Sequence, residues 1–145
     1  GRMQPYRLPG GVVCIDDTYN ANPDSVRAAI DVLASLPAPR VLVLGDMGEV
    51  GDNGPAMHRE VGAYAREMGV DRLLTLGDAT RESTLAFGPG AGAYESVEQV
   101  CEALRAIAPA SVLVKGSRFM RMERIVKEYM HLNGVAPGEV VSHAV

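Results

Sequence analysis

The fold of this chain is decided by the stretch Cys14-Ile15-Asp16-Asp17-Thr18-Tyr19-Asn20-Ala21-Asn22-Pro23-Asp24-Ser25. The apolar run that leads into it, residues 12–15, predicts a buried strand. Asn22 suits a helix N-cap, and Pro23 and Asp24 suit the first helical turn. A polar loop is therefore expected between the carboxyl end of a strand and the start of a helix. In open α/β sheets this is where ligands bind.

The same alternation of apolar strand and amphipathic helix continues to the end of the pattern. Further strands are predicted at 40–44, 72–76 and 111–114, with a weaker signal at 93–94. The strands are uninterrupted apolar runs, which is typical of a parallel sheet covered on both faces. The sequence therefore predicts an α/β fold, Rossmann-like and doubly wound, with a mostly parallel sheet and helices on both faces.

Helix boundaries follow from caps and stop signals. A helix is expected from about Pro55 to Gly69, and Asp78 is a candidate N-cap for a shorter helix that ends before Gly88. Ser96, with Gln99 three residues later, fits a capping box. The helix that follows is expected to bury Val97, Val100, Cys101, Leu104 and Ala108. A last helix is expected to turn Met122, Ile125, Val126 and Tyr129 inward.

Composition excludes several classes of function. The 145 residues carry a net charge of −4 with no cluster of Lys and Arg, which argues against a nucleic-acid surface. No apolar run is long enough for a membrane span, and the start does not resemble a signal peptide, so a cytoplasmic protein is expected. Cys14 and Cys101 occupy apolar positions and are expected to be buried free thiols.

Unusual polar residues follow four of the predicted strands, at 16–22, 45–51, 77–81 and 115–118. Because parallel strands end at the same edge of a sheet, these segments should surround one crevice. The segments expected at the opposite edge, 37–39, 69–70 and 108–109, carry no such polar residues. This asymmetry predicts a binding site at the carboxyl edge.

Each motif is weak by itself. The loop 45–51 is not a G-x-G-x-x-G fingerprint, and a turn that needs positive φ explains its glycines at least as well as phosphate binding. No G-x-x-x-x-G-K-[ST] occurs. His58 has no second His or Cys cluster nearby, so we expect a solvent-exposed residue of a first helical turn. With no evident nucleophile, acid–base pair or metal cluster, no catalytic residue and no metal ligand is assigned.

The polar residues of the first loop each have two explanations. Asp16 and Asp17 could hold a ribose hydroxyl or a cation, or simply cap the loop, which we expect of Asp16. Tyr19 could stack on a flat ring or only pack, and Asn22 is expected to do no more than cap its helix. In the last strand-end motif, Lys115 and Arg118 could hold a carboxylate or phosphate, or be ordinary surface charges.

Four motifs together resemble a known family. Residues 17–25 are similar to the D-[ST]-Y-N-A-N-P-x-S signature of MurF-type Mur ligases, which add D-alanyl-D-alanine to UDP-N-acetylmuramoyl-tripeptide. The resemblance continues through 44–51, 58–62 and 114–118, in order and over nearly the whole chain. It implies the C-terminal domain of a three-domain enzyme, whose missing domains carry the P-loop and most of the ATP and Mg²⁺ site. Alone, such a domain is expected to be inactive.

The resemblance also implies roles for individual residues. Asp17 would contact ATP near the ribose or terminal phosphate, while Tyr19 and Asn20 would line the nucleotide side of the cleft. Arg2 would reach the γ-phosphate, unless Gly1-Arg2 is a cloning remnant before Met3. The candidates for the dipeptide and peptide substrates are Asp78, Arg81, Lys115, Ser117 and Arg118.

The implied boundaries are a linker end or cloning scar at 1–10, a domain at 11–134 and a tail at 135–145. The family's own amino-terminal and central domains would be the partners of this one. A free-standing α/β module that binds a nucleotide or metabolite without catalysis remains the alternative, because it too would lack a P-loop.

Overall fold

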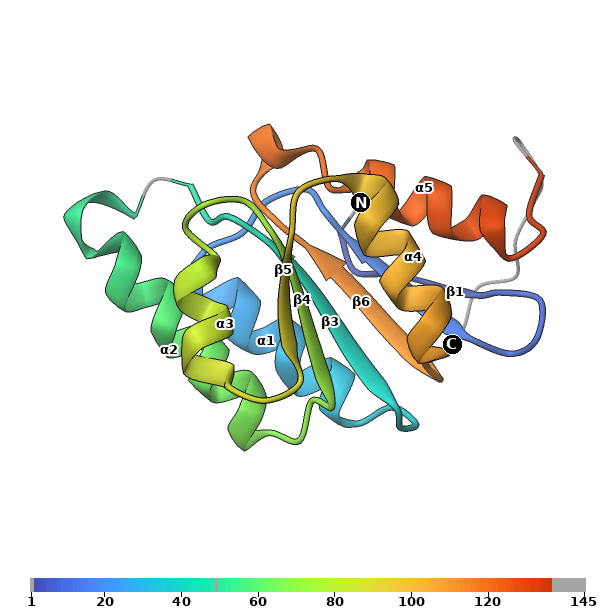
Figure 1. The fold of residues 1–145 in the computed structure, drawn as a ribbon, viewed down its shortest axis with the longest axis horizontal. Coiled ribbons are helices and arrows are strands. Elements are labelled where there is room, and N and C mark those ends of the chain that lie inside the picture. Colours follow the sequence, from blue (N-terminus) through green and yellow to red (C-terminus); the bar gives the residue numbers. More distant parts are fainter. Residues whose placement is uncertain (1, 49, 137–145) are drawn as a thin grey trace.

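The computed structural model describes residues 2–48 and 50–136, which form one six-stranded sheet with helices on both sides (Figure 1). The strand order is β1-β2-β6-β3-β4-β5. The strands are β1 (Gln4–Arg7), β2 (Val13–Asp17), β3 (Arg40–Gly45), β4 (Arg72–Leu76), β5 (Ala91–Tyr94) and β6 (Ser111–Lys115). The helices are α1 (Pro23–Ala34), α2 (Gly54–Glu67), α3 (Arg81–Phe87), α4 (Val97–Ile107) and α5 (Glu123–Leu132). Two 3₁₀ turns, η1 (Gly51–Asn53) and η2 (Arg118–Met120), precede α2 and α5.

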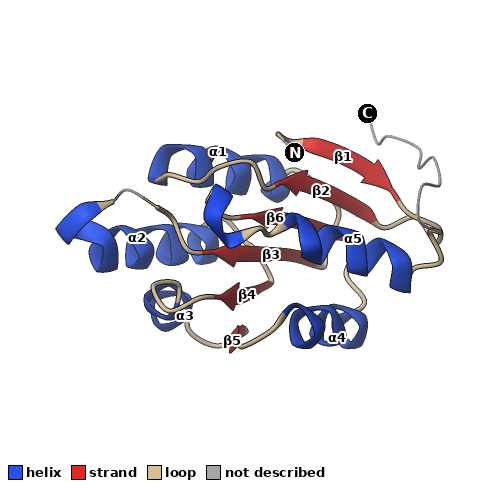
Figure 2. Ribbon diagram, turned by 90° about the horizontal axis from the view of Figure 1, so that it is seen from above, coloured by secondary structure: helices blue, strands red, loops and turns tan. Residues whose placement is uncertain are grey.

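The sheet is parallel except for β1, which pairs antiparallel with β2. Figure 2 shows the arrowheads of β2, β3 and β4 pointing one way and that of β1 the other. Strand β6 is inserted between β2 and β3, with Asp17 beside Lys115 and Leu44 beside Lys115 in register. The carboxyl ends of β2, β6, β3 and β4 therefore lie in a row at one edge.

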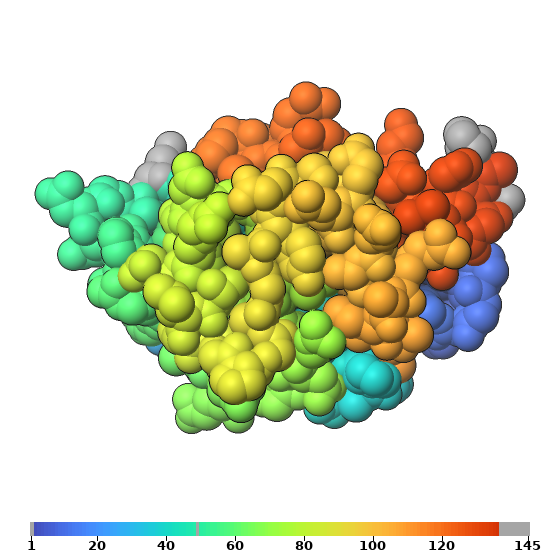
Figure 3. Space-filling model, viewed as in Figure 1, coloured from blue at the N-terminus to red at the C-terminus, as the bar shows by residue number. Residues whose placement is uncertain are grey.

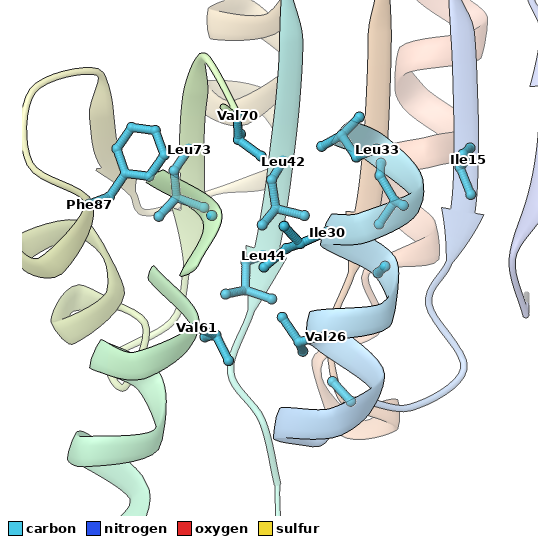
Figure 4. Close-up of a cluster of buried hydrophobic side chains, with 14 of the residues drawn as sticks. Ile15, Val26, Ile30, Leu33, Leu42, Leu44, Val61, Val70, Leu73 and Phe87 are labelled. Carbon is cyan, nitrogen blue, oxygen red and sulfur yellow. The ribbon is translucent and has the colours of Figure 1, made fainter. Parts of the chain in front are cut away.

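Each face of the sheet buries its own apolar cluster, which confirms the predicted doubly wound α/β fold. On one face α1 packs against β3, with Val26, Ile30 and Leu33 turned toward Leu42 and Leu44 (Figure 4). On the other face α4 and α5 cover the alternate residues of the same strands. A side chain of this size contributes about 1.5–3 kcal/mol when it is fully buried. Continuous apolar strands are required because both faces are dry.

The helix predictions are confirmed in outline and wrong in two details. The buried face of α1 is the predicted one, and Asn22 caps it by accepting the Ser25 N–H at 2.8 Å. The N-cap of α3 is Thr80, not Asp78, and no side chain caps this helix. Ala108 is exposed rather than buried, because α4 ends there in a left-handed conformation at φ +53°.

Strand β1 was not predicted, since residues 1–10 were expected to be a linker end or a scar. Residues 4–7 instead form the outermost strand of the sheet, in which Gln4 and Arg7 pair with Asp16 and Val13 of β2. Among the described residues no helix is long and apolar enough to cross a membrane. Of the expected tail, Val135 packs in the core and residues 137–145 lie outside the described part.

Candidate functional site at the carboxyl edge of the sheet

The centre of the carboxyl edge is a buried ion pair between β2 and β6. Lys115 Nζ lies 2.9 Å from Asp17 Oδ2, and the Lys115 residue is only 2% exposed. The same ammonium donates to the Asn20 carbonyl at 3.0 Å, while Asp17 Oδ1 accepts the Met3 N–H at 3.2 Å. A buried pair of charges needs such extra hydrogen bonds to offset its desolvation. The pair thereby holds the β2–α1 loop and the amino-terminal segment against the sheet.

The remaining polar residues of the β2–α1 loop stabilise the loop itself. Asp16 Oδ1 accepts both the N–H and the hydroxyl of Thr18, at 3.2 and 2.6 Å, so it caps the loop as predicted. Asn22 and Ser25 exchange side-chain and main-chain hydrogen bonds, which form a capping box at the start of α1. Tyr19 is left half exposed, and the Arg2 guanidinium stacks 4.0 Å from its ring centroid.

These residues enclose a hollow of about 280 Å³. It is lined by Arg2, Asp17, Tyr19, Asn20, Asn22, Ser25 and Lys115. All four nucleotide-side candidates, Asp17, Tyr19, Asn20 and Arg2, thus line one hollow. The charges of Lys115 and Asp17 offset each other, so the unpaired positive contributions are the Arg2 guanidinium and the amino-terminal end of α1, which favour an anion.

A larger cleft of about 700 Å³ continues from the same loop toward η2. Tyr19 and Asn20 form one wall, and Ser117, Arg118 and Phe119 form the other. Ser117 is buried and donates to the Asp46 carbonyl at 2.6 Å, so it supports the wall from behind. Arg118 is exposed and lies 3.4 Å from Glu123.

Another cleft, of about 480 Å³, lies on the other side of η2, between the ends of β4 and β5 and the start of α4. It contains Asp78 and Arg81, which are separated from the other candidates. Arg81 pairs with Glu95 at 2.8 Å and lies 4.0 Å from Asp78. In the space-filling view the orange atoms of the β6–α5 connection border the gold atoms at the start of α4 (Figure 3).

Phe119 is a site residue that the sequence analysis missed. It is 66% exposed and lines both the 700 Å³ and the 480 Å³ clefts. Its ring packs against Gly48, where an added Cβ would lie 3.1 Å from the ring. The available signal was an aromatic residue directly after the polar motif 115–118, in a segment with no helical periodicity.

The prediction for His58 is wrong, because this side chain is fully buried. Its Nε2 accepts the Met47 N–H at 3.0 Å, so Nδ1 is the protonated nitrogen and donates to the Gly54 carbonyl at 2.7 Å. A neutral imidazole therefore joins the β3–α2 loop to the first turn of α2. Nearby, Gly51 adopts φ +59°, as expected for a turn; Glu49 of the predicted glycine-rich segment lies outside the described residues.

The remaining reactive groups lie in the core. Cys14 and Cys101 are free and buried, as predicted, and burial raises the pKa of each thiol to about 12. Burial also raises the pKa of Tyr129 to about 12. In the described part of the chain no group of three or more His, Cys, Asp or Glu residues could hold a metal ion.

Comparison with known proteins relates this chain to a family of enzymes. The chain is 39% identical, over 130 residues, to the UDP-N-acetylmuramoyl-tripeptide–D-alanyl-D-alanine ligase of Escherichia coli; the match covers 88% of this chain and 29% of the enzyme. The enzyme of the same name from Bacillus subtilis is 34% identical over 136 residues. The chain thus spans about three tenths of the length of these relatives.

A crystal structure of MurF from Acinetobacter baumannii has the same fold, with a TM-score of 0.82 and 31% identity. The superposition covers 90% of this chain and 30% of that one. The family model "Mur ligase, glutamate ligase domain" matches residues 1–135, which include β1 and all four strand-end motifs. The chain therefore belongs to the Mur ligase family, in its glutamate ligase domain.

Proposed function

We propose that this chain is the C-terminal domain of an ATP-dependent ligase of peptidoglycan precursor synthesis, which acts in the cytoplasm. The ligase joins D-alanyl-D-alanine to UDP-N-acetylmuramoyl-tripeptide. Residues 11–134 are the body of the domain, and residues 1–10 are the end of the inter-domain linker, with β1 docked on the sheet. The relatives that carry this name are about three times as long, which leaves room for the further domains of the proposed enzyme.

The observation that carries the proposal is the convergence of four distant motifs on one edge. The signature 17–25 and the segment 114–118 meet in the Asp17–Lys115 pair, and the segments 44–51 and 77–81 end beside them. Side chains from four strands thus surround adjacent clefts. A closing domain needs such a surface in order to complete a site whose other half lies on a partner domain.

In the proposed reaction, the terminal carboxylate of the tripeptide attacks the γ-phosphorus of ATP, the bond to the bridging oxygen breaks, and ADP leaves, which gives an acyl phosphate. The neutral amine of the dipeptide then attacks the acyl carbon and loses a proton, an amide bond forms, and the carbon–oxygen bond breaks so that inorganic phosphate leaves with the bond electrons. The domain contributes by positioning reactants, by stabilising charge and by excluding water from the acyl phosphate.

The nucleotide side of the proposed site is the 280 Å³ hollow with its neighbouring loop. Arg2 lies on the surface of Tyr19, from which its guanidinium can swing to a terminal phosphate. Asp17 uses one lone pair on each oxygen for Lys115 and Met3, which leaves further lone pairs for a ribose hydroxyl. Mg²⁺ and the phosphate-binding loop are assigned to the upstream domains.

The dipeptide side of the proposed site is the 480 Å³ cleft. A dipeptide zwitterion needs a cation for its carboxylate and an acceptor for its amine. Arg81 supplies the first, and Asp78 and Glu95 supply the second. Lys115 and Ser117 act from behind the walls, while Arg118 is exposed toward the peptide.

The test uses the full-length gene product with ATP, UDP-N-acetylmuramoyl-tripeptide and D-alanyl-D-alanine. Phosphate release and the mass of the product are measured. We expect ligation by the wild type, and a loss of at least about tenfold in Asp17→Ala, equivalent to roughly 1.4 kcal/mol. Asp71→Ala, at the opposite edge, is the control and should retain activity. A wild type that binds nucleotide but forms no amide would instead indicate a binding module without catalysis.

A further inference from the structure

Asp46 is a residue with no assigned role that contacts two of the cleft-forming loops at once. It directly follows β3, which lies between β6 and β4 in the sheet. Its carboxylate accepts the main-chain N–H groups of Ala79 and Thr80, at 3.2 and 2.9 Å. Hydrogen bonds to an ionised carboxylate are stronger than those between neutral groups. Asp46 therefore tethers the β4–α3 loop from below.

The main-chain carbonyl of Asp46 holds the loop that follows β6, on the other side of β3 from the β4–α3 loop. Its carbonyl accepts both the N–H and the hydroxyl of Ser117, at 3.1 and 2.6 Å. The side chain and the carbonyl of a single residue thus hold the loops that follow β4 and β6. These two loops are opposite walls of the 480 Å³ cleft, one with Arg81 and the other with Phe119.

The turn after β4 is shaped to admit this carboxylate. Gly77 has φ +123°, and a Cβ at this position would lie 2.4 Å from Asp46 Oδ1. Any side chain at position 77 would therefore push the carboxylate away from Ala79 and Thr80. The close approach requires both an Asp at 46 and a Gly at 77.

We propose that Asp46 is a positioning residue that sets the separation of the two walls of the 480 Å³ cleft. Arg81 follows Thr80 directly, so the hydrogen bond from Thr80 to Asp46 fixes where α3 begins and where the guanidinium can reach. On the other wall, the two bonds from Ser117 fix the start of η2 and the place of Phe119. The identity of the ligand as a dipeptide rests on the function proposed above.

The experiment compares three variants of the full-length enzyme: Asp46→Asn, Gly77→Ala and Asp71→Asn. Asp46→Asn keeps the shape but turns one acceptor into an amide that faces a main-chain N–H. Gly77→Ala displaces the carboxylate without changing it. Asp71→Asn is the matched control, because Asp71 also accepts a main-chain N–H, that of Arg40 at 2.8 Å, at the opposite edge.

In Asp46→Asn and Gly77→Ala, the KM for D-alanyl-D-alanine is expected to rise about tenfold, the effect of losing one charge-assisted hydrogen bond. The KM for ATP should stay within about twofold, because the Asp17–Lys115 pair is untouched. Amide hydrogen exchange at Thr80 should become faster in both variants. Asp71→Asn should change neither KM nor the exchange at Thr80.

Two results would overturn the proposal. One is an unchanged KM for the dipeptide although exchange at Thr80 is faster. The other is a parallel rise in both KM values that Asp71→Asn reproduces, which would indicate a general structural defect. If the wild type forms no amide, the proposed function fails by itself; faster exchange at Thr80 in Asp46→Asn would then still support the tether, and unchanged exchange would refute it.

Discussion

The two edges of the sheet differ in the hydrogen bonds that join their connections. At the amino edge, main-chain bonds, such as those from Ala110 N to Pro39 O and from Asp71 N to Arg40 O, each at 2.9 Å, lie beside bonds from side chains to main-chain groups, such as that from Ser111 to the Pro37 carbonyl at 2.8 Å. At the carboxyl edge the connections are joined by side chains, through the Lys115–Asp17 pair and the carboxylate of Asp46.

This difference has a physical cause. Main chains that pack directly against each other satisfy their own polar groups, whereas loops that diverge around clefts leave gaps that side chains span. Particular side chains therefore matter at both edges, and several of those at the carboxyl edge also line the clefts. Substitutions at the carboxyl edge should change ligand binding and turnover, whereas substitutions at the amino edge should change only the free energy of unfolding.

The largest expected effect is a loss of unfolding free energy, caused by a substitution at the carboxyl edge. Lys115→Met leaves the Asp17 carboxylate buried without its partner, so the free energy of unfolding should fall by about 3–5 kcal/mol. Urea denaturation measures this. The double variant Asp17→Asn with Lys115→Met should recover part of the loss, because no uncompensated charge remains. A loss of less than about 1 kcal/mol would mean that water solvates the Asp17 carboxylate in place of Lys115 at little cost in free energy.

The next effect separates ligand handling from stability. Arg2→Ala should lower kcat/KM of the proposed full-length ligase at least about tenfold, or 1.4 kcal/mol, while the free energy of unfolding changes by less than about 1 kcal/mol. Arg27→Ala is the matched control, since Arg27 also stacks on a tyrosine, Tyr64, at 5.1 Å but away from the edge. Equal losses in the two variants would remove Arg2 from the site.

A smaller effect tests the amino edge. Ser111 is buried and donates to the Pro37 carbonyl at 2.8 Å, so Ser111→Ala should cost about 1 kcal/mol in unfolding free energy. The kcat/KM of ligation should stay within about twofold. A tenfold loss of ligation would contradict the separation of the two edges.

The smallest effect concerns the core between the edges. Because the folded pKa of Cys14 and Cys101 is raised from 9.0 to about 12, the folded state keeps protons that the unfolded state loses. Stability is therefore full below pH 9 and falls as the pH rises toward 12, by about 0.4 kcal/mol for each thiol at pH 9. Urea denaturation at pH 7.5 and pH 9 measures this difference.

A control with both cysteines replaced by alanine should lose this part of the pH dependence. In native buffer at pH 8 a thiol reagent should label neither cysteine, and in urea it should label both. Rapid labelling of the native protein would contradict the raised pKa values and the burial of both thiols.

Most of the fold could be predicted because its signals are local. Continuous apolar strands, the cap at Asn22 and the buried stripe of α1 each involve residues close in sequence. Two of the failures, strand β1 and His58, involve non-local partners. Strand β1 forms only because β2 offers an open edge, and His58 is buried because the β3–α2 loop folds back over it.

The position of the candidate site was predictable from the sequence, but which of its residues are buried and which are exposed was not. The rule that parallel strands end at one edge predicted that these four segments lie together, and the structure places them at one edge. It could not separate Lys115 and Ser117, which are buried behind the walls, from Tyr19 and Phe119, which are exposed on them. Exposure depends on how neighbouring loops cover each other, and no pattern within one loop contains that information.

The sequence by itself determined the fold class, the family resemblance and the edge at which polar residues gather, because these follow from periodicity, caps and short motifs. Only the tertiary structure decided which of those residues are partners. Asp17 and Lys115 are 98 positions apart, and Asp46 reaches loops that lie 33 and 71 positions further along the chain. Contacts between such distant residues exist only once the sheet has aligned their strands, so the division of the edge into separate clefts is a property of the folded chain.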